Sequence, residues 1–230
     1  MRIIAHIRTD FPEKFGIPRQ SGLVEGLKGR VVFQPEYRNP EAFRGLEAFS
    51  HIWLLWQFSQ AQRPGWSATV RPPRLGGKTK VGVFATRSPF RPNGIGLSSV
   101  RLERLQLDGP EGPVLHVAGI DMMDGTPIYD VKPYIPYADC HPDATQGYTE
   151  ATQEHGLQVE FPPELLAIYP ERKQAAVLGL LAQDPRPAYV QDPERVYGVT
   201  FAGYDVKFQV EGHCLRVCDV IPRPGIHGEP

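Results

Sequence analysis

The sequence predicts a mainly β protein, in which an N-terminal β-barrel domain without a Rossmann sheet precedes a small C-terminal α+β domain. Three observations support this prediction. The chain has 24 Pro and 23 Gly among its 230 residues, and so many turn formers favour short strands over long helices. Short runs of β-branched and apolar residues recur between these turns. None of the runs leads into the GxGxxG fingerprint that opens a Rossmann sheet.

The first elements are two short strands, IIAHI and VVF, separated by a polar loop over residues 10–29. Four apolar side chains would anchor this loop on a core, so we expect it to be functional rather than a simple connection. A short helix is expected next over residues 40–49, because Asn39 can cap the free amides and Pro40 suits the first helical position. The run SHIWLLWQFSQ that follows fits a buried strand.

The centre of the sequence is the stretch KVGVFATRSPFRPNGIGLSSVRL, which reads as strand, loop and strand. Two Pro and two Gly make the loop RSPFRPNGIG stiff. It would hold Arg87, Arg91 and Asn93 in set directions, and these side chains suit phosphate, carboxylate or the edge of a base. The alternative is a rigid hairpin loop whose arginines are merely solvated.

The second half of the sequence begins with the strands LSSVRLERLQL and VLHVAGIDMMD, joined by the turn DGPEGP. A further turn, DGTP, leads into the extended aromatic segment IYDVKPYIPYAD. We predict domain boundaries at 1–145 for the barrel, 146–162 for a linker and 163–230 for the C-terminal domain. The last domain would contain a helix or helix pair broken near Pro170, followed by the strands YGVTF, YDVKFQV and CLRVCDVI.

The net charge of −1 hides two bands of opposite sign. The segment from Arg71 to Arg104 contains eight basic residues and one acid, Glu103, which gives a net charge of +7. The segment from Leu105 to Leu165 contains eleven acids and one basic residue, Lys132, which gives a net charge of −10. The basic band indicates a local polyanion site. The alternative is a solvated face that pairs with the acidic segment after folding.

Several common sites and locations are disfavoured. The sequence has no P-loop, GxSxG, HExxH or CxxC motif. The three cysteines fit neither a disulfide framework nor a zinc site, so reduced, structural thiols and no bound metal are expected. No apolar run is long enough for a membrane span and the N-terminus lacks a signal peptide's apolar region, so we expect a cytoplasmic protein. From the residues alone, the prediction stops at a ligand-binding β domain, for a nucleotide or RNA.

Six ordered motifs carry a more specific resemblance: PRQSGL, RGLEAFSHIWLL, VRPPRLGG, GVFATRSPFRPNGIGLS, DGTPIYDVKPYIPYAD and LAQDPRPAY. Together they resemble the TrmO (TsaA-like) family of S-adenosylmethionine-dependent tRNA methyltransferases, over nearly the whole chain. The resemblance implies methylation of N6 of N6-threonylcarbamoyladenosine, next to the anticodon of threonine tRNAs. It also implies a homodimer with a β-barrel that binds the methyl donor, and tRNA bound through its anticodon stem-loop. Two alternatives stay open: a non-catalytic RNA- or nucleotide-binding module, and a methyltransferase with another acceptor.

The resemblance assigns roles to particular positions of this chain. The residues it implies for binding S-adenosylmethionine are Pro18, Arg19, Gln20, Ser59, Gln60, Arg87, Leu97, Asp124, Gly125, Thr126 and Pro127. Substrate contacts would come from Arg91, Asn93 and Arg186. The acceptor nitrogen must lose a proton, and our candidates to accept it are Lys132, in its neutral form, Tyr134, and a water held by Asn93. The chain departs from the family at Gly94, where Pro is common, and at Ser59, where His is common.

Overall fold

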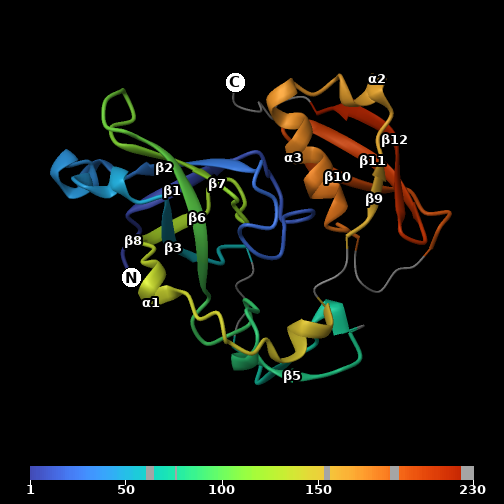
Figure 1. The fold of residues 1–230 in the computed structure, drawn as a ribbon, viewed down its shortest axis with the longest axis horizontal. Helices are drawn as coiled ribbons and strands as arrows, with labels where there is room; N and C mark the ends of the chain where they lie inside the picture. Colours follow the sequence, from blue (N-terminus) through green and yellow to red (C-terminus); the bar gives the residue numbers. More distant parts are fainter. Residues whose placement is uncertain (61–64, 76, 153–155, 187–191, 224–230) are drawn as a thin grey trace.

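A computed structural model describes residues 1–60, 65–75, 77–152, 156–186 and 192–223. It confirms the mainly β fold, with a closed antiparallel barrel of order β1-β2-β7-β6-β3-β8 (Figure 1). The barrel strands are β1 (Ala5–Thr9), β2 (Lys28–Phe33), β3 (His51–Gln57), β6 (Ile95–Gln106), β7 (Val114–Ala118) and β8 (Pro127–Pro133). Closure leaves these six strands without an open edge.

Alternation of side chains explains how the barrel forms its core. In β3, Ile52, Leu54 and Trp56 are buried, while the residues between them are partly or fully exposed. Since successive side chains of a strand point to opposite faces, one face of β3 fills the barrel and the other faces outward. The run SHIWLLWQFSQ is therefore a strand, as predicted, but only one of its faces is buried.

The prediction of one continuous helix over residues 40–49 is wrong, because this segment forms short 3-10 helices. Three short 3-10 helices occur here, at Pro35–Tyr37 before the segment and at Pro40–Phe43 and Leu46–Ala48 within it. Asn39 caps the second of them as expected, because its side-chain oxygen accepts the Glu41 N–H at 3.1 Å. Gly45 then adopts a left-handed φ of 86°, which ends the turn before an α-helix can form.

The C-terminal part is a four-stranded sheet of order β10-β11-β12-β9, with α3 lying along it (Figure 1). Its elements are β9 (Gln158–Glu160), α2 (Pro163–Leu166), α3 (Glu171–Ala182), β10 (Tyr197–Phe201), β11 (Tyr204–Glu211) and β12 (Cys214–Pro222). The break between the two helices at Pro170 and the three final strands are confirmed. Strand β9 pairs in parallel with β12 from within the stretch expected to be a linker.

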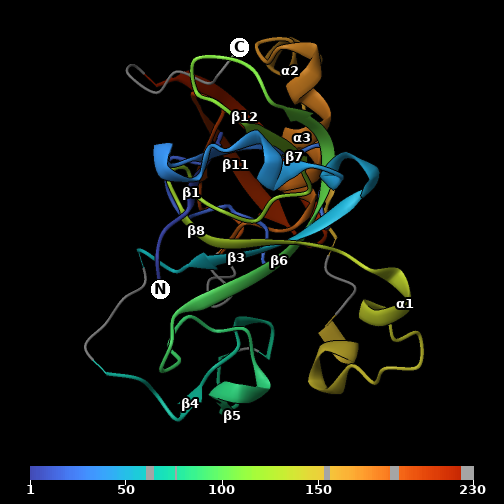
Figure 2. The ribbon, with the colours of Figure 1, turned by 90° about the vertical axis from the view of Figure 1, so that its left-hand side faces the viewer.

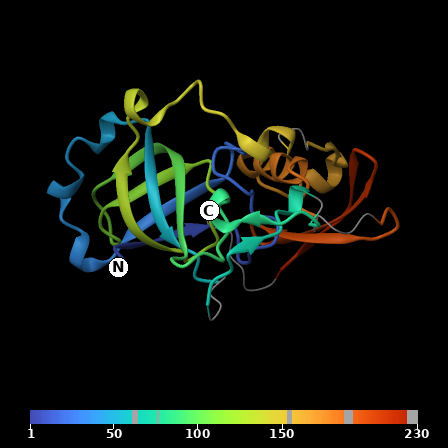
Figure 3. The same cartoon turned by 90° about the horizontal axis from the view of Figure 1, so that it is seen from below.

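A long excursion, residues 58–94, leaves the barrel after β3 and returns at β6 (Figures 2 and 3). It contains the two-stranded sheet of β4 (Thr69–Val70) and β5 (Val81–Gly82), with 3-10 turns at Pro73–Leu75 and Val83–Ala85. The run KVGVFAT is thus strand over only two residues. The Thr86 N–H and hydroxyl both donate to the Val83 carbonyl, at 3.1 and 2.8 Å, and close a turn instead.

The remaining helices follow β8 and lead towards the C-terminal sheet. They are α1 (Pro136–Asp139) and a 3-10 helix at Gly147–Thr152. The second of these lies near the excursion at the bottom of Figure 1. Residues 187–189 of the LAQDPRPAY motif and Glu154 of the acidic band lie outside the described residues.

The N-terminal loop, residues 10–27, joins the barrel to the C-terminal sheet. Phe11 packs on Phe201 with ring centroids 5.3 Å apart, and the Ala202 N–H donates to the Asp10 carbonyl at 3.1 Å. Gly16 has a φ of 88°, and a Cβ there would lie 2.1 Å from Val199. Only glycine lets the loop approach β10 so closely.

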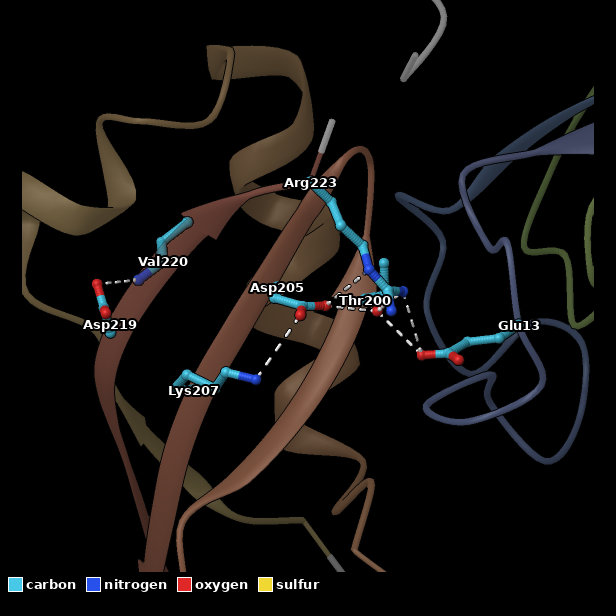
Figure 4. Close-up of polar contacts among 7 residues, drawn as sticks. All are labelled: Glu13, Thr200, Asp205, Lys207, Asp219, Val220 and Arg223. Atoms are coloured by element: carbon cyan, nitrogen blue, oxygen red, sulfur yellow. Dashed lines mark hydrogen bonds and ion pairs between the residues drawn. The ribbon is translucent and has the colours of Figure 1, made fainter. Parts of the chain in front are cut away.

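Polar contacts strengthen the same junction. The Asp10 carboxylate pairs with Lys173 of α3, with side chains only 8% and 17% exposed. Figure 4 shows a second group, in which the Thr200 hydroxyl lies 2.9 Å from Glu13 Oε1 and 2.6 Å from Asp205 Oδ1. Arg223 donates to the same hydroxyl at 3.0 Å. The loop is therefore held by residues far away in the sequence.

Candidate active site

A large cavity of about 1330 Å³ lies where the N-terminal loop meets the excursion and the 3-10 helix at Gly147–Thr152. Its lining comes from four stretches of chain: residues 19–23, 65–73, 84–90 and 146–149. Of the eleven positions predicted to bind the donor, Arg19, Gln20 and Arg87 lie in this lining. The structure thus brings the PRQ motif and the central loop to one site.

Arg87 is fixed by a side chain of the N-terminal loop. One of its terminal nitrogens donates to Gln20 Oε1, and the Gln20 amide nitrogen donates to the Arg19 carbonyl at 2.6 Å. The amide orientation of Gln20 is therefore set by two contacts. This arrangement presents a guanidinium to the cavity in a defined direction.

Behind Arg87 lies a largely buried carboxylic acid that sequence reasoning missed. Asp121 Oδ1 accepts the Ser98 hydroxyl at 2.6 Å, and Ser98 in turn accepts the Trp56 indole N–H at 2.9 Å. Burial raises the pKa of Asp121 from 3.8 to about 6, although Ser98, a backbone hydrogen bond from Ser21 and the charge of Arg87 act against the rise. Asp121 therefore connects the barrel interior to the N-terminal loop and to Arg87.

The predicted donor positions 124–127 form a turn at the end of β1. Asp124 Oδ1 accepts the Thr9 N–H at 3.0 Å, and its other oxygen lies 3.5 Å from Arg8. Thr126 is buried and donates to the Met123 carbonyl at 2.7 Å. These side chains hold the turn against β1, and they do not belong to the lining of the cavity.

Ser59, Gln60 and Leu97 also lie outside the lining. The first two follow the end of β3, and Leu97 points outward from β6, where it is 49% exposed. Strand register pairs Gln57 with Ile95 and Trp56 with Ile128. The predicted donor positions that follow β3, lie on β6 and precede β8 are therefore neighbours at one end of the barrel.

The two predicted proton acceptors lie at the opposite end of β8 from Pro127. Lys132 is paired with Asp130 at 2.9 Å. The ring of Tyr134 packs beside Trp53, with centroids 5.6 Å apart. Strand β8 has 7 residues from Pro127 to Pro133, which corresponds to a length of about 20 Å at the rise of a β-strand. Within one chain, Lys132 and Tyr134 are thus separated from the donor turn at residues 124–127, whereas Leu97 pairs with β3 only two positions from the partner of Lys132.

The predicted substrate-binding residues have different surroundings. Arg91 donates to the Thr86 carbonyl at 2.9 Å and so braces the central loop, while Asn93 is exposed. Arg186 makes two bonds of 2.8 and 2.9 Å to Asp184 and is only 14% exposed. It lines a small hollow of about 60 Å³ together with Pro18 and Arg19. Arg186 is therefore held by Asp184 and offers little surface to a phosphate.

The single acid of the basic band, Glu103, is ion-paired. Arg101 and Lys28 both contact Glu103, at 3.1 and 3.0 Å, and these contacts lower the pKa of that carboxyl against the opposing effect of burial. Because Glu103 lies within the basic band, these pairs do not test the alternative in which the band pairs with the acidic segment. Arg71 and Arg87, in contrast, line the cavity.

Other expectations concern cysteines, metals and membranes. All three cysteines are free, with Cys140 and Cys218 exposed and Cys214 partly exposed. No group of three or more His, Cys, Asp or Glu among the described residues is arranged to hold a metal ion. In the same part of the chain, no helix is long and apolar enough to cross a bilayer.

Comparison with known proteins decides the family. The family model described as the tRNA-methyltransferase O N-terminal domain matches residues 6–140, and the TrmO C-terminal domain matches residues 154–223. The chain belongs to the tRNA-methyltransferase O family. The predicted resemblance is therefore confirmed, and it extends through both parts of the chain.

Individual relatives agree with this assignment. An Escherichia coli protein named tRNA (adenine(37)-N6)-methyltransferase is 41% identical over 228 residues, which cover 96% of this chain and 97% of that protein. A Pseudomonas aeruginosa relative, named as an S-adenosylmethionine-dependent methyltransferase, is 44% identical over 94% of this chain and 95% of its own. The crystal structure of TrmO from P. aeruginosa matches with a TM-score of 0.76 at 39% identity, covering 96% of this chain and 95% of that one.

Proposed function

We propose that this TrmO-family protein transfers a methyl group from S-adenosylmethionine to N6 of N6-threonylcarbamoyladenosine at position 37 of threonine tRNAs, in the cytoplasm. The observation that carries the proposal is the match, over nearly the full length of both chains, to the E. coli tRNA (adenine(37)-N6)-methyltransferase. The absence of a GxGxxG motif agrees with a donor site built on a barrel.

The residues around the cavity fit the chemical groups of the donor. S-adenosylmethionine supplies an activated methyl group, and it also carries a carboxylate, a positive centre and an adenine. Arg87, held by Gln20, suits the carboxylate. Asp121, with its pKa of about 6, is mostly ionised at pH 7 and places negative charge behind Arg87. Leu23 and Phe90 offer apolar surface in the same cavity.

The chain's contribution to methyl transfer is alignment and exclusion of water. A neutral thioether leaves, so the reaction requires no general acid, and positioning supplies most of the rate. The acceptor nitrogen is conjugated to a carbonyl and must lose a proton, for which Lys132 in its neutral form is our candidate acceptor. Desolvation, Cys140 and Asp139 raise the pKa of Tyr134, so its phenol stays protonated at neutral pH and would orient the acceptor nitrogen as a hydrogen-bond partner.

In a homodimer, Lys132 and Tyr134 of one copy could lie beside the cavity of the other copy. Lys132 and Tyr134 are about a strand length from the donor turn at residues 124–127 of their own chain, so they would act on a donor held by a second copy. Apolar Leu55 and Leu97 face each other across β3 and β6 on the outward face of the barrel, and Leu97 is well exposed. Such a face would suit contact with a second copy.

Mixed dimers test this arrangement. Arg87→Ala and Tyr134→Phe chains would each be inactive alone, and mixing them would restore one intact site in each mixed dimer. Activity that stays absent in the mixture, with dimers confirmed by light scattering, would contradict a shared site.

For the reaction itself, the decisive measurement is nucleoside mass spectrometry. Threonine tRNA carrying unmethylated N6-threonylcarbamoyladenosine is incubated with the protein and S-adenosylmethionine. The expected result is a gain of one methyl group on that nucleoside. Donor binding without any methyl gain would instead favour a binding module or a different acceptor.

A further inference from the structure

Two aromatic residues in the cavity have no role in the site as described so far. Trp66 and Phe84 are 54% and 72% exposed, although large aromatic side chains usually bury most of their surface. Their rings stack on each other, with centroids 6.1 Å apart and planes inclined by 24°. Both line the cavity. Together they offer a broad aromatic surface to whatever enters it.

The backbone beneath Phe84 is held firmly. Its neighbour Val83 is buried and serves as the anchor of the 3-10 turn Val83–Ala85. The Val83 N–H donates to the Ala68 carbonyl at 3.0 Å, and the Val83 carbonyl accepts both donors of Thr86. Phe84 is thus presented to solvent by a turn whose conformation is fixed from both sides.

The backbone beside Trp66 is fixed in a similar way. The Ser67 N–H donates to the Phe90 carbonyl at 3.1 Å, and the Ser67 hydroxyl donates to the Thr69 carbonyl at 2.5 Å. Thr69 then pairs with Gly82 in the β4–β5 ladder. A binding surface that is already ordered loses little conformational entropy when a ligand arrives.

The charged side chains among the described lining residues are all basic. The described residues that line the cavity include Arg19, Arg71 and Arg87, and none of them is Asp or Glu. Flat aromatic faces combined with arginines and without carboxylates are the composition of sites that bind single-stranded nucleic acid, in which bases stack and phosphates meet cations.

We propose that Trp66 and Phe84 form a stacking platform for a base of the RNA substrate, on the nucleotide next to the one that is methylated. The inference rests on the proposed function. An acceptor base must leave its stack to reach a catalytic site, and its neighbour then loses a stacking partner. The aromatic pair replaces that partner.

The size of the cavity favours RNA over the adenine of the methyl donor as the occupant. Sites for small molecules commonly measure about 300–1,000 Å³, whereas this cavity measures about 1330 Å³. The volume accommodates more than one nucleotide. The competing possibility is that the adenine of the methyl donor stacks on the aromatic pair, and the test below distinguishes the two.

The test uses the full-length protein and a fluorescein-labelled anticodon stem-loop RNA that carries N6-threonylcarbamoyladenosine at position 37. Fluorescence anisotropy gives Kd for wild type, Trp66→Ala, Phe84→Ala and Trp66→Phe, and calorimetry gives Kd for S-adenosylmethionine. Each alanine variant should bind the RNA about tenfold more weakly or worse, which is about 1.4 kcal/mol. Trp66→Phe should recover most of the affinity, and donor affinity should stay within about twofold of wild type. Phe49→Ala, an exposed aromatic outside the cavity lining, serves as the matched control and should change neither constant.

A second arm identifies the base. Abasic nucleotides are introduced one at a time at the positions flanking 37. One of them should weaken binding to wild type and leave binding to Trp66→Ala unchanged, because the base and the ring then act as one pair.

Three outcomes would overturn the inference. Alanine variants that bind the RNA as wild type does, while wild type methylates it, would remove the platform and keep the proposed function. Weakened donor binding with unchanged RNA binding would assign the rings to the donor's adenine. A wild-type protein that binds S-adenosylmethionine but not the RNA would reject the proposed function, and the platform with it.

Discussion

Replacing Asp121 by Asn should change how the stability of the protein depends on pH. Burial raises the pKa of this carboxyl from 3.8 to about 6 in the folded state. At about 1.4 kcal/mol per pKa unit, ionising it in the fold costs about 3 kcal/mol more than in the unfolded chain. The asparagine side chain of the variant is similar in shape and carries no charge, so this cost disappears.

The sign of the effect follows from proton binding. The folded state holds the proton of Asp121 more tightly than the unfolded state, so stability falls as pH rises from about 4 through the folded pKa of about 6. Wild type carries the whole cost above about pH 7, and the variant carries none of it at any pH. The free energy of unfolding of Asp121→Asn, relative to wild type, should therefore increase by about 2 kcal/mol between pH 4.5 and pH 8.

Urea unfolding of both proteins at several pH values across this range measures the difference directly. Asp143→Asn, a change at an exposed carboxyl, is the control and should give a difference that is flat with pH. A flat difference for Asp121→Asn as well would refute the reasoning, since burial would then not raise the pKa of this carboxyl. A difference that falls with rising pH would show that Arg87 dominates the site.

Three further predictions concern the junction, the central loop and the donor contact. Lys173→Met should lower the free energy of unfolding by about 3–5 kcal/mol in urea titrations, because it leaves Asp10 charged, buried and unpaired. Recovery of this free energy by a second change, Asp10→Asn, would confirm the cause. Gly94→Pro should stabilise the fold by about 0.4–1 kcal/mol in the same assay, because a Cβ there meets only ordinary contacts at 3.9 Å; a loss of stability would contradict this. Arg87→Lys keeps the charge but loses the planar guanidinium that Gln20 holds. Calorimetry should therefore give about a tenfold higher Kd for S-adenosylmethionine. An unchanged Kd would remove Arg87 from the proposed donor site.

The fold was predictable where local signals agree with tertiary packing. Short β-branched runs between Pro- and Gly-rich turns gave the barrel strands, and the proline at position 170 separated the two helices of the C-terminal part. Prediction failed where one residue overrides a pattern. Gly45 breaks the expected helix, and Thr86 turns the end of KVGVFAT into a 3-10 turn.

The site was predictable only in part, because its chemistry depends on contacts between distant residues. The motifs located Arg19, Gln20 and Arg87, but Asp121 looks like any acid beside a turn. Its importance comes from burial against Ser98 and from the approach of Ser21, neither of which is local in the sequence. Lys132 and Tyr134 belong to the same motif as the donor turn, yet strand β8 carries them to its other end.

The junction in Figure 4 ties the start of the chain to its end, and this has a consequence for synthesis. Glu13 is 187 positions from Thr200, and Asp10 is 163 positions from Lys173. Contacts between such distant positions form slowly, because a long loop of chain must close first. On the ribosome, the loop that carries Arg19 and Gln20 emerges early but lacks these supports until residues as far as Arg223 have emerged. A nascent chain would thus hold the loop of residues 10–27 without its supports, and this loop would reach its final conformation only after the residues up to Arg223 had emerged.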